Sequence, residues 1–247
     1  MAQPGRLQNR VVLITGGGRG IGRAAACAFA RAGARVIVAA RTEVNLEATV
    51  AEIRAAGGQA EWRVVDLGYP KKAAALGQWV LRRHGVIDVL INNAAALGPK
   101  AFIVDYPFEQ WEEVLRINLH SLFSLTQIVA RSMLARKAGC IISLSSSVGR
   151  RGRAGWGGYA VSKAGLESLT QTLSDELRAY NVRVLALNPG ATRTEMRALA
   201  YPDEVPQTLK RAEVVAGVLV DLAVREDMAL SGRSFDAEQI LKEGIRP

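Results

Sequence analysis

Near-continuous apolar runs alternate along the chain with segments whose apolar residues recur every three or four positions. Short runs of valine, isoleucine and leucine are typical of strands that are buried on both faces of a parallel sheet. The segments between them have the spacing of amphipathic helices. The pattern predicts strands at residues 11–15, 35–40, 61–66, 89–92, 140–145 and 182–188, and helices at 21–32, 43–56, 71–84, 108–137 and 159–180. Glycines stand where the helices should end, at Gly33, Gly57, Gly58, Gly85 and Gly139.

The repeated strand–helix–strand order predicts the fold class. Such units build an α/β, Rossmann-type, doubly wound parallel sheet, here of about seven strands, with helices on both faces. No linker or internal repeat divides the chain, so we expect a single domain over residues 1–247. Residues 192–212 interrupt the alternation. We expect this insertion to cover the crevice at the carboxyl ends of the strands, where ligands bind in such sheets.

The composition is that of an ordinary globular protein. Apolar residues make up 49% of the chain and charged residues 22%, which argues against disorder. No stretch approaches the ~20 apolar residues of a membrane helix, and residues 1–10 lack the apolar core of a signal peptide. We therefore expect a cytoplasmic protein that makes no membrane contact. Cys27 and Cys140 are too few for a disulfide framework and should be core residues. We expect no metal site.

The formal net charge of +9 raises the question of an anionic partner. Such a charge can indicate nucleic acid, an anionic membrane surface or a small anionic ligand. The densest basic cluster is Arg150, Arg151 and Arg153, and it contains no aromatic residue. We interpret it as a solvated loop and do not expect nucleic acid as a partner.

A glycine-rich segment lies between the first predicted strand and the first predicted helix. Gly16, Gly20 and Gly22 have the spacing Gly-x-x-x-Gly-x-Gly rather than Gly-x-Gly-x-x-Gly. Glycines permit a tight turn and a close approach of a pyrophosphate to a helix N-terminus. A turn with only a structural role is the alternative, but the position after a buried strand favours dinucleotide binding.

The end of the second predicted strand indicates which dinucleotide is bound. NAD-binding sheets often carry Asp or Glu there, which binds the ribose 2′-hydroxyl. This chain instead has Arg41 and Thr42. A guanidinium pairs with a 2′-phosphate, and Arg19 in the glycine turn supplies a second one. The sequence therefore predicts NADP(H) rather than NAD(H), unless Arg41 is only a solvated surface charge.

Tyr159 and Lys163 form a candidate proton-transfer pair. Residues at positions i and i+4 share one face of a helix. A phenol normally ionises near pH 10, and a nearby ammonium lowers its pKa. Tyr159 could then act as general acid or base. Residues 145–147 are serines at the end of a predicted strand, where a hydroxyl can hold a substrate oxygen, although serines there could also only cap a turn.

Together these motifs resemble the short-chain dehydrogenase/reductase family over nearly the whole chain. The stretch from residue 146 to residue 163 and the segments around residues 191–197 and 206–210 are most similar to its YciK-like members; members that act as 3-oxoacyl reductases are also similar. The matching pieces are Thr15 to Gly22, Asp66-Leu67, Asn92-Asn93-Ala94-Ala95, Asn118, Ser145 to Ser147, Tyr159-x-x-x-Lys163 and Asn188-Pro189-Gly190.

The resemblance implies roles for individual residues. Tyr159 would transfer the proton, Lys163 would lower its pKa and bind the nicotinamide ribose, Ser146 would polarise the carbonyl, and Asn118 would hold a water linked to Lys163. Asp66 would lie near the adenine. The implied cofactor contacts are Gly16, Gly18, Arg19, Gly20, Ile21, Gly22, Arg41, Thr42, Asp66, Leu67, Asn92, Asn93, Ala94, Tyr159, Lys163, Pro189, Gly190, Thr192 and Thr194.

The expected function is therefore NADPH-dependent reduction of a small carbonyl compound, or oxidation of the matching secondary alcohol. One alternative is reduction of a 3-oxoacyl thioester carried by an acyl carrier protein, which a basic surface could attract. An alternative of another class is a catalytically silent dinucleotide sensor or scaffold. The resemblance also implies self-association to a dimer or tetramer. Ala95 replaces a frequent glycine of the family, and the C-terminal segment departs from the family's pattern.

Overall fold

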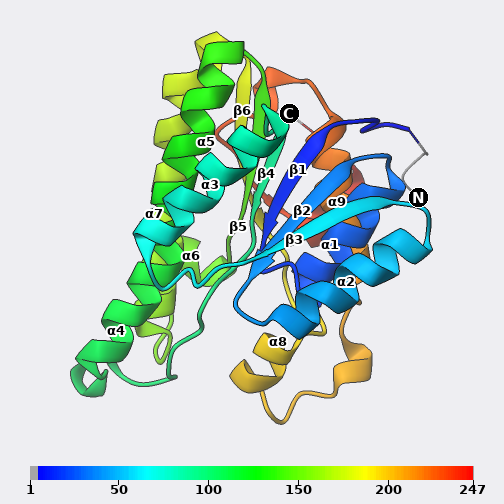
Figure 1. Cartoon of the computed structure of the whole chain (residues 1–247). Coiled ribbons are helices and arrows are strands. Elements are labelled where there is room, and N and C mark those ends of the chain that lie inside the picture. Colours follow the sequence, from blue (N-terminus) through cyan, green and yellow to red (C-terminus); the bar gives the residue numbers. More distant parts are fainter. Residues whose placement is uncertain (1–4, 247) are drawn as a thin grey trace.

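A computed structural model describes residues 5–246 of the chain, so residues 1–4 and 247 of the expected domain lie outside it. Its seven parallel strands form one sheet in the order β3-β2-β1-β4-β5-β6-β7 (Figure 1). The predicted doubly wound parallel sheet is confirmed. The strands are β1 (Val11–Thr15), β2 (Arg35–Ala40), β3 (Gln59–Val64), β4 (Val89–Asn92), β5 (Gly139–Leu144), β6 (Val182–Asn188) and β7 (Ser234–Asp236).

Helices cover both faces of the sheet. One face carries α1 (Gly20–Arg31), α2 (Glu43–Ala55) and α9 (Ala212–Val224), and the other carries α3 (Pro70–His84), α5 (Leu122–Arg136) and α7 (Gly157–Leu177) (Figure 1). Adjacent residues of β5 enter opposite cores: Ile141 lies in the core with Met133, and Ile142 lies in the core with Phe29. This two-sided burial explains why the strands are apolar at nearly every position.

Shorter elements lie mostly at the ends of the main ones. They are α4 (Phe108–Leu115), a π-helix (Arg116–Ser121), α6 (Ser147–Arg150), α8 (Glu195–Ala200), α10 (Ala237–Glu243), and 3-10 turns at Ile103–Asp105, Arg178–Tyr180, Pro206–Thr208 and Met228–Leu230. Figure 1 shows α4 and α8 at the end of the sheet where β1 leads into α1. Within residues 5–246, no helix is both long enough and apolar enough to cross a membrane.

The structure corrects several predicted boundaries. The expected single helix 108–137 is divided by the π-helix, whose wider turn inserts Asn118 into the interior. The third strand ends at Val64 rather than 66, and the expected helix 159–180 begins at Gly157. Gly139 does not end a helix, because Lys137 adopts the left-handed conformation (φ 54°) and Gly139 begins β5.

Three elements near the C-terminus are absent from the predicted set. Helix α9 is almost entirely apolar, and eight of its residues are buried, so it shows no polar stripe from which a helical period could be read. Strand β7 has only three residues and pairs with β6 at the edge of the sheet. Such a short strand gives little alternation to detect. Helix α10 follows β7 directly.

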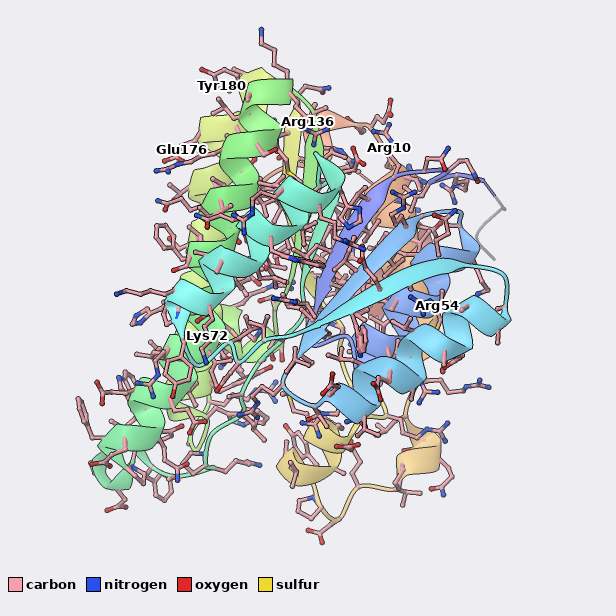
Figure 2. The ribbon with its side chains drawn as sticks, in the orientation of Figure 1. Arg10, Arg54, Lys72, Arg136, Glu176 and Tyr180 are labelled. Carbon is pink, nitrogen blue, oxygen red and sulfur yellow. The ribbon has the colours of Figure 1, made fainter. Side chains whose placement is uncertain are left out.

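Asp88 joins three segments at the amino end of the sheet. Its carboxylate accepts a hydrogen bond from the backbone N–H of Val11 (2.8 Å) and pairs with Arg10 (3.3 Å) and Arg136 (3.4 Å). Figure 2 shows Arg10 and Arg136 at the end of the sheet away from α8. The contacts anchor the start of β1 and the end of α5 far from the glycine turn.

Ile142 is fully buried at the centre of the sheet, and its truncation tests the core. We expect Ile142→Ala to lower the free energy of unfolding by about 2–5 kcal/mol and Ile142→Val by about 1 kcal/mol, because truncation leaves a cavity. Chemical unfolding followed by circular dichroism measures both. Val44 is 66% exposed, so Val44→Ala should change stability by less than about 0.5 kcal/mol. Equal losses at the two sites would contradict the assigned core.

Candidate active site

The glycine turn between β1 and α1 depends on backbone conformations and close approaches. Gly16 and Gly20 have positive φ values of 67° and 53°. A Cβ at Gly22 would collide with the carbonyl oxygen of Gly16 and with the side chain of Asn93. The first turn of α1 contains no acidic residue, so its free N–H groups can meet an anion without a competing carboxylate.

The loop after β4 is tied to this turn. The Asn93 side chain donates to the carbonyl oxygens of Thr15 (2.9 Å) and Gly16 (3.2 Å), and Thr15 Oγ1 accepts from the backbone N–H groups of Asn93 and Ala94 (3.0 and 3.1 Å). These bonds fix the two strand ends that flank the crevice between β1 and β4. The order in which successive strands are added to the sheet reverses between β1 and β4, and ligands bind at this position in doubly wound folds.

A cleft of about 500 Å³ extends from this turn along the carboxyl edge of the sheet. Most of the site residues expected from the sequence line it. They are Gly16, Gly18, Arg19, Gly20, Ile21, Arg41, Thr42, Asp66, Leu67, Asn93, Ala94, Tyr159, Lys163, Pro189 and Thr194. Ser145, from the expected serine cluster, also lines it, and further lining residues without an individual role in the sequence analysis are Asn45, Val65, Gly68, Ile117, Leu144, Glu195 and Leu199. No local pattern marks these side chains.

Four of the expected cofactor contacts lie behind the wall of the cleft. Gly22 lies beneath the glycine turn. The Asn92 side chain is buried and donates to Thr126 Oγ1 (3.0 Å) and Ser143 Oγ (3.2 Å). Gly190 and Thr192 form the turn after β6, where Thr192 Oγ1 donates to the carbonyl oxygen of Pro189 (3.2 Å). In this structure these four residues hold the wall in place.

Two arginines lie at the end of the cleft where β2 stops. Arg41 is exposed and forms no ion pair with any residue between 5 and 246. Arg19 pairs with Glu195, the first residue of α8. That ion pair joins the glycine turn to the insertion at residues 192–212.

Tyr159 and Lys163 face the other end of the cleft from one turn of α7. Their side chains are buried, with 9% and 3% exposure. Lys163 Nζ donates to the carbonyl oxygen of Leu144 (2.6 Å) and lies 5.6 Å from the centre of the Tyr159 ring. The structure therefore brings the predicted pair together at the end of β5.

Burial shifts the pKa values of the pair in opposite directions. It raises the pKa of the Tyr159 phenol to about 12, and the Ser146 hydroxyl acts in the lowering direction. From the sequence we expect the Lys163 ammonium to lower the pKa of Tyr159. In the structure that pKa is raised, because desolvation of the phenol dominates. Burial also lowers the pKa of Lys163 to about 8, and the charge of Glu167 raises it.

Ser146 and Asn118 support the pair from two sides. Ser146 precedes the short helix α6, which packs so closely on α7 that a Cβ at Gly149 would lie 2.8 Å from Lys163 Cβ. Asn118 accepts from the backbone N–H of Ala96 (2.7 Å) and donates to Ser162 Oγ (3.0 Å), which donates to the carbonyl oxygen of Tyr159 (2.8 Å). Asn118 thus reaches the pair through Ser162.

The basic cluster at residues 150–153 is only partly the solvated loop that the sequence predicts. Arg151 and Arg153 are exposed. Arg150 instead pairs with Asp236 (2.6 Å) and donates to Ser234 (2.8 Å), so it fastens α6 to β7. Arg150 is exposed as well, but its pairing was not expected, because its partners lie on a strand that the pattern does not reveal.

Aromatic side chains form the outer wall beside Tyr159. The Trp156 ring centre lies 5.8 Å from those of Tyr159 and Tyr201. Lys100 lies over the rings of Trp156 (5.2 Å) and Tyr201 (4.7 Å) and donates to the carbonyl oxygen of Ala200 (3.0 Å). Met196 and Leu199 of α8 line the same cleft. The arrangement can enclose an apolar group next to the phenol.

Comparison with known proteins gives consistent matches. Residues 10–205 match the family model described as short chain dehydrogenase. The chain is 37% identical over 242 residues to the uncharacterized oxidoreductase YciK of Escherichia coli (strain K12), covering 97% of this chain and 96% of that one. It is 34% identical over 237 residues to the 3-oxoacyl-[acyl-carrier-protein] reductase FabG of Thermotoga maritima, covering 92% and 96%.

Solved structures agree with these matches. A putative short chain dehydrogenase from Shigella flexneri, complexed with NADP, superposes with a TM-score of 0.90 at 36% identity, covering 96% of this chain and all of that one. One from Escherichia coli CFT073, complexed with NADPH, gives the same TM-score, identity and coverage. On the residues of the cleft, the fold and these matches, the chain belongs to the short-chain dehydrogenase family of oxidoreductases.

Proposed function

We propose that the protein transfers a hydride between NADP(H) and the carbonyl carbon of a small molecule, with Tyr159 as the general acid or base. The observation that carries the proposal is the buried Tyr159–Lys163 pair on the wall of a cleft that begins at a glycine turn. Bound NADPH would supply the hydride. The protein supplies binding, orientation and the proton.

The residues of the cleft fit this cofactor. The glycine turn leaves a backbone-lined cradle at the N-terminus of α1, suited to a pyrophosphate. Arg41 offers a guanidinium without a carboxylate partner among the described residues, and Arg19 lies on the same cleft. Two guanidinium groups favour a 2′-phosphate, and no carboxylate stands at the end of β2 to repel it. Structural relatives complexed with NADP and NADPH support this assignment.

The protonation states of the pair suit carbonyl reduction. A phenol with a pKa of about 12 is neutral at pH 7 and can donate its proton to the substrate oxygen. The ammonium of Lys163, whose pKa is about 8, is mostly charged at that pH and stabilises the phenolate that remains. We assign Ser146 to the substrate oxygen, and Asn118 to a proton path that ends in a water near Lys163.

The walls of the cleft favour an apolar carbonyl compound. Leu97, Met196 and Leu199 line it, Leu97 packs beside Tyr159, and the Trp156 ring lies next to the phenol. We assign the insertion at residues 192–212 to cover the bound substrate, since α8 carries two of these side chains. Exclusion of water strengthens the electrostatic interactions of the pair.

A 3-oxoacyl thioester on an acyl carrier protein is the second candidate substrate. Two matching relatives are 3-oxoacyl-[acyl-carrier-protein] reductases, from Thermotoga maritima and a Synechocystis strain, at 34% and 33% identity. Arg151 and Arg153 are exposed and could meet an acidic carrier. A silent sensor or scaffold is disfavoured, because Asn118, Ser146, Tyr159 and Lys163 all keep competent side chains.

We further propose that the chain forms a dimer or tetramer. Phe123 on α5 and Val161 on α7 are nearly half exposed, with 46% and 45% of their surface accessible. Both helices lie on the same outer face of the molecule (Figure 1). Apolar side chains on an outer face are suited to burial against a second copy.

Removal of one oxygen tests the proton donor. Tyr159→Phe should lower kcat for NADPH-dependent carbonyl reduction by at least about 100-fold, the usual contribution of a positioned general acid. The phenyl ring should keep its contact with Trp156 and so preserve the shape of the cleft. The Kd for NADPH, measured by fluorescence titration, should therefore stay within about twofold of that of the parent protein. Residual activity above a tenth of that of the parent protein would show that another group donates the proton.

The cofactor preference tests the role of Arg41. We expect kcat/KM to be at least about tenfold higher with NADPH than with NADH, because a hydrogen bond to a charged group contributes about 1.5–3 kcal/mol. Arg41→Asp should remove or reverse that preference by repelling the 2′-phosphate. Arg131 is an exposed arginine on α5, and Arg131→Asp serves as the control. Equal rates with the two cofactors in the parent protein would refute the NADP(H) assignment.

A direct assay separates the two substrate classes. If the chain acts on carrier-bound thioesters, acetoacetyl-carrier protein should be reduced with a lower KM than the free thioester, and Arg151→Glu with Arg153→Glu should raise only the former KM. NADPH oxidation at 340 nm measures both. A rate at background level with the carrier substrate would remove this candidate and leave the small carbonyl compound.

A further inference from the structure

Glu167 is a buried carboxylate one helical turn beyond Lys163. Its exposure is 8%, and one oxygen, Oε1, accepts hydrogen bonds from Ser145 Oγ (2.5 Å) and Ser234 Oγ (2.7 Å). Arg150 Nε lies 3.5 Å from the same oxygen. A buried carboxylate is retained only where such partners replace its lost hydration.

These contacts connect Glu167 to the end of β5 beside Lys163 and to the ends of β6 and β7. Ser145 directly precedes Ser146 and follows β5, whose last carbonyl group, that of Leu144, accepts from Lys163 Nζ. Beyond Ser234, Arg150 binds Asp236 (2.6 Å), and Asp236 accepts from the side chain of Asn188 (2.5 Å) at the end of β6. One hydrogen-bonded network therefore spans the carboxyl ends of three adjacent strands.

We propose that Glu167 is a positioning residue of the active site, whose carboxylate holds Ser145 and the end of β5 against α7 and keeps the buried ammonium of Lys163 charged. The inference rests on the proposed function of Lys163. It adds a residue that touches neither the cleft nor the reacting atoms.

Glu167 is the charged group that acts on the Lys163 ammonium. The other titratable groups around Lys163 are neutral, exposed or paired elsewhere. On α7 the other titratable group one turn from Lys163 is Tyr159, which is neutral at pH 7. On α6 and β7, Arg150 and Asp236 are paired with each other. The π-helix presents the neutral Asn118 inward, while its Arg116 and His120 are exposed, as are the glutamates Glu109, Glu112 and Glu113 of α4. On β6, Arg183 binds the carbonyl oxygens of Leu222 and Ala223 in α9.

The sign of the effect follows from the charge. Burial lowers the pKa of Lys163, and the carboxylate of Glu167 opposes that shift. Replacing the carboxylate by an amide removes only the opposing effect, so Lys163 should lose its proton at a lower pH. Reduction needs the ammonium, and activity should therefore persist below this pKa and be lost as pH rises through it.

Glu167→Gln is the discriminating variant, because its amide oxygen can still accept from both serines. We expect the alkaline decline of kcat to move down by about one pH unit, so that kcat falls about fivefold at pH 8 and changes less than about twofold at pH 6. A role in packing alone would lower kcat by the same factor at every pH. Glu167→Ala also removes the acceptor and should lower both kcat and the melting temperature at every pH.

Glu176 supplies the matched control on the same helix. It is exposed, and Figure 2 places it beside Tyr180 at the far end of α7. Glu176→Gln makes the same change in net charge, and we expect its pH profile to match that of the parent protein. A shift in both variants would indicate a general charge effect and overturn the proposal.

A titration without turnover separates this inference from the proposed reaction. The Cε signal of Lys163, labelled with ¹³C and assigned with Lys163→Met, should titrate near pH 8 in the parent protein and about one unit lower in Glu167→Gln. An unchanged titration would overturn the inference even in an active enzyme. A shifted titration in a protein that reduces no carbonyl compound would instead refute the proposed function and leave the coupling intact.

Discussion

The close approach of two strand ends is the constraint on which the rest of the site depends. The turn after β1 and the loop after β4 are held together by Thr15 and Asn93, whose side chains satisfy backbone groups of the opposite segment. Gly22 has no room for a side chain at this contact. Once the two ends are fixed, the reversal of strand order between β1 and β4 opens a crevice at a defined place. The glycines therefore serve the packing of the protein as well as the approach of a ligand.

Burial changes the pKa values of Tyr159 and Lys163 more than their proximity to each other does. The same desolvation raises the pKa of Tyr159 and lowers that of Lys163, because it penalises the charged form of each group. Burial thus favours the neutral form of each group, and a neighbouring group opposes each of the two shifts. Ser146 acts on the phenol, and Glu167 acts on the ammonium. The pKa values of Tyr159 and Lys163 thus depend on Ser146, which lies between β5 and α6, and on Glu167, which lies farther along α7.

Local patterns predicted the fold, and most of the cofactor contacts expected from them line one cleft, for a physical reason. A glycine turn, a strand end and an i,i+4 pair are each encoded within a few residues, and buried parallel strands are apolar throughout. Asn118 could be named only through the family resemblance, because its position depends on a π-helix within a longer helical pattern. The sequence does not single out Glu167, since a lone glutamate on a helix normally faces water. Its burial depends on Ser234, which lies on a strand of only three residues.

The structure indicates the reaction class more clearly than the substrate, because the residues assigned to each lie in different parts of the chain. Tyr159, Lys163 and the glycine turn lie at the ends of long, well-packed elements. The outer wall instead combines side chains from loops and short helices, joined by contacts such as that of Lys100 with Ala200, which are 100 residues apart in the sequence. The ion pair of Arg19 with Glu195 extends this wall to the cofactor end. Specificity of this kind comes from long-range contacts between irregular segments, and these vary in a fold whose sheet and main helices stay the same.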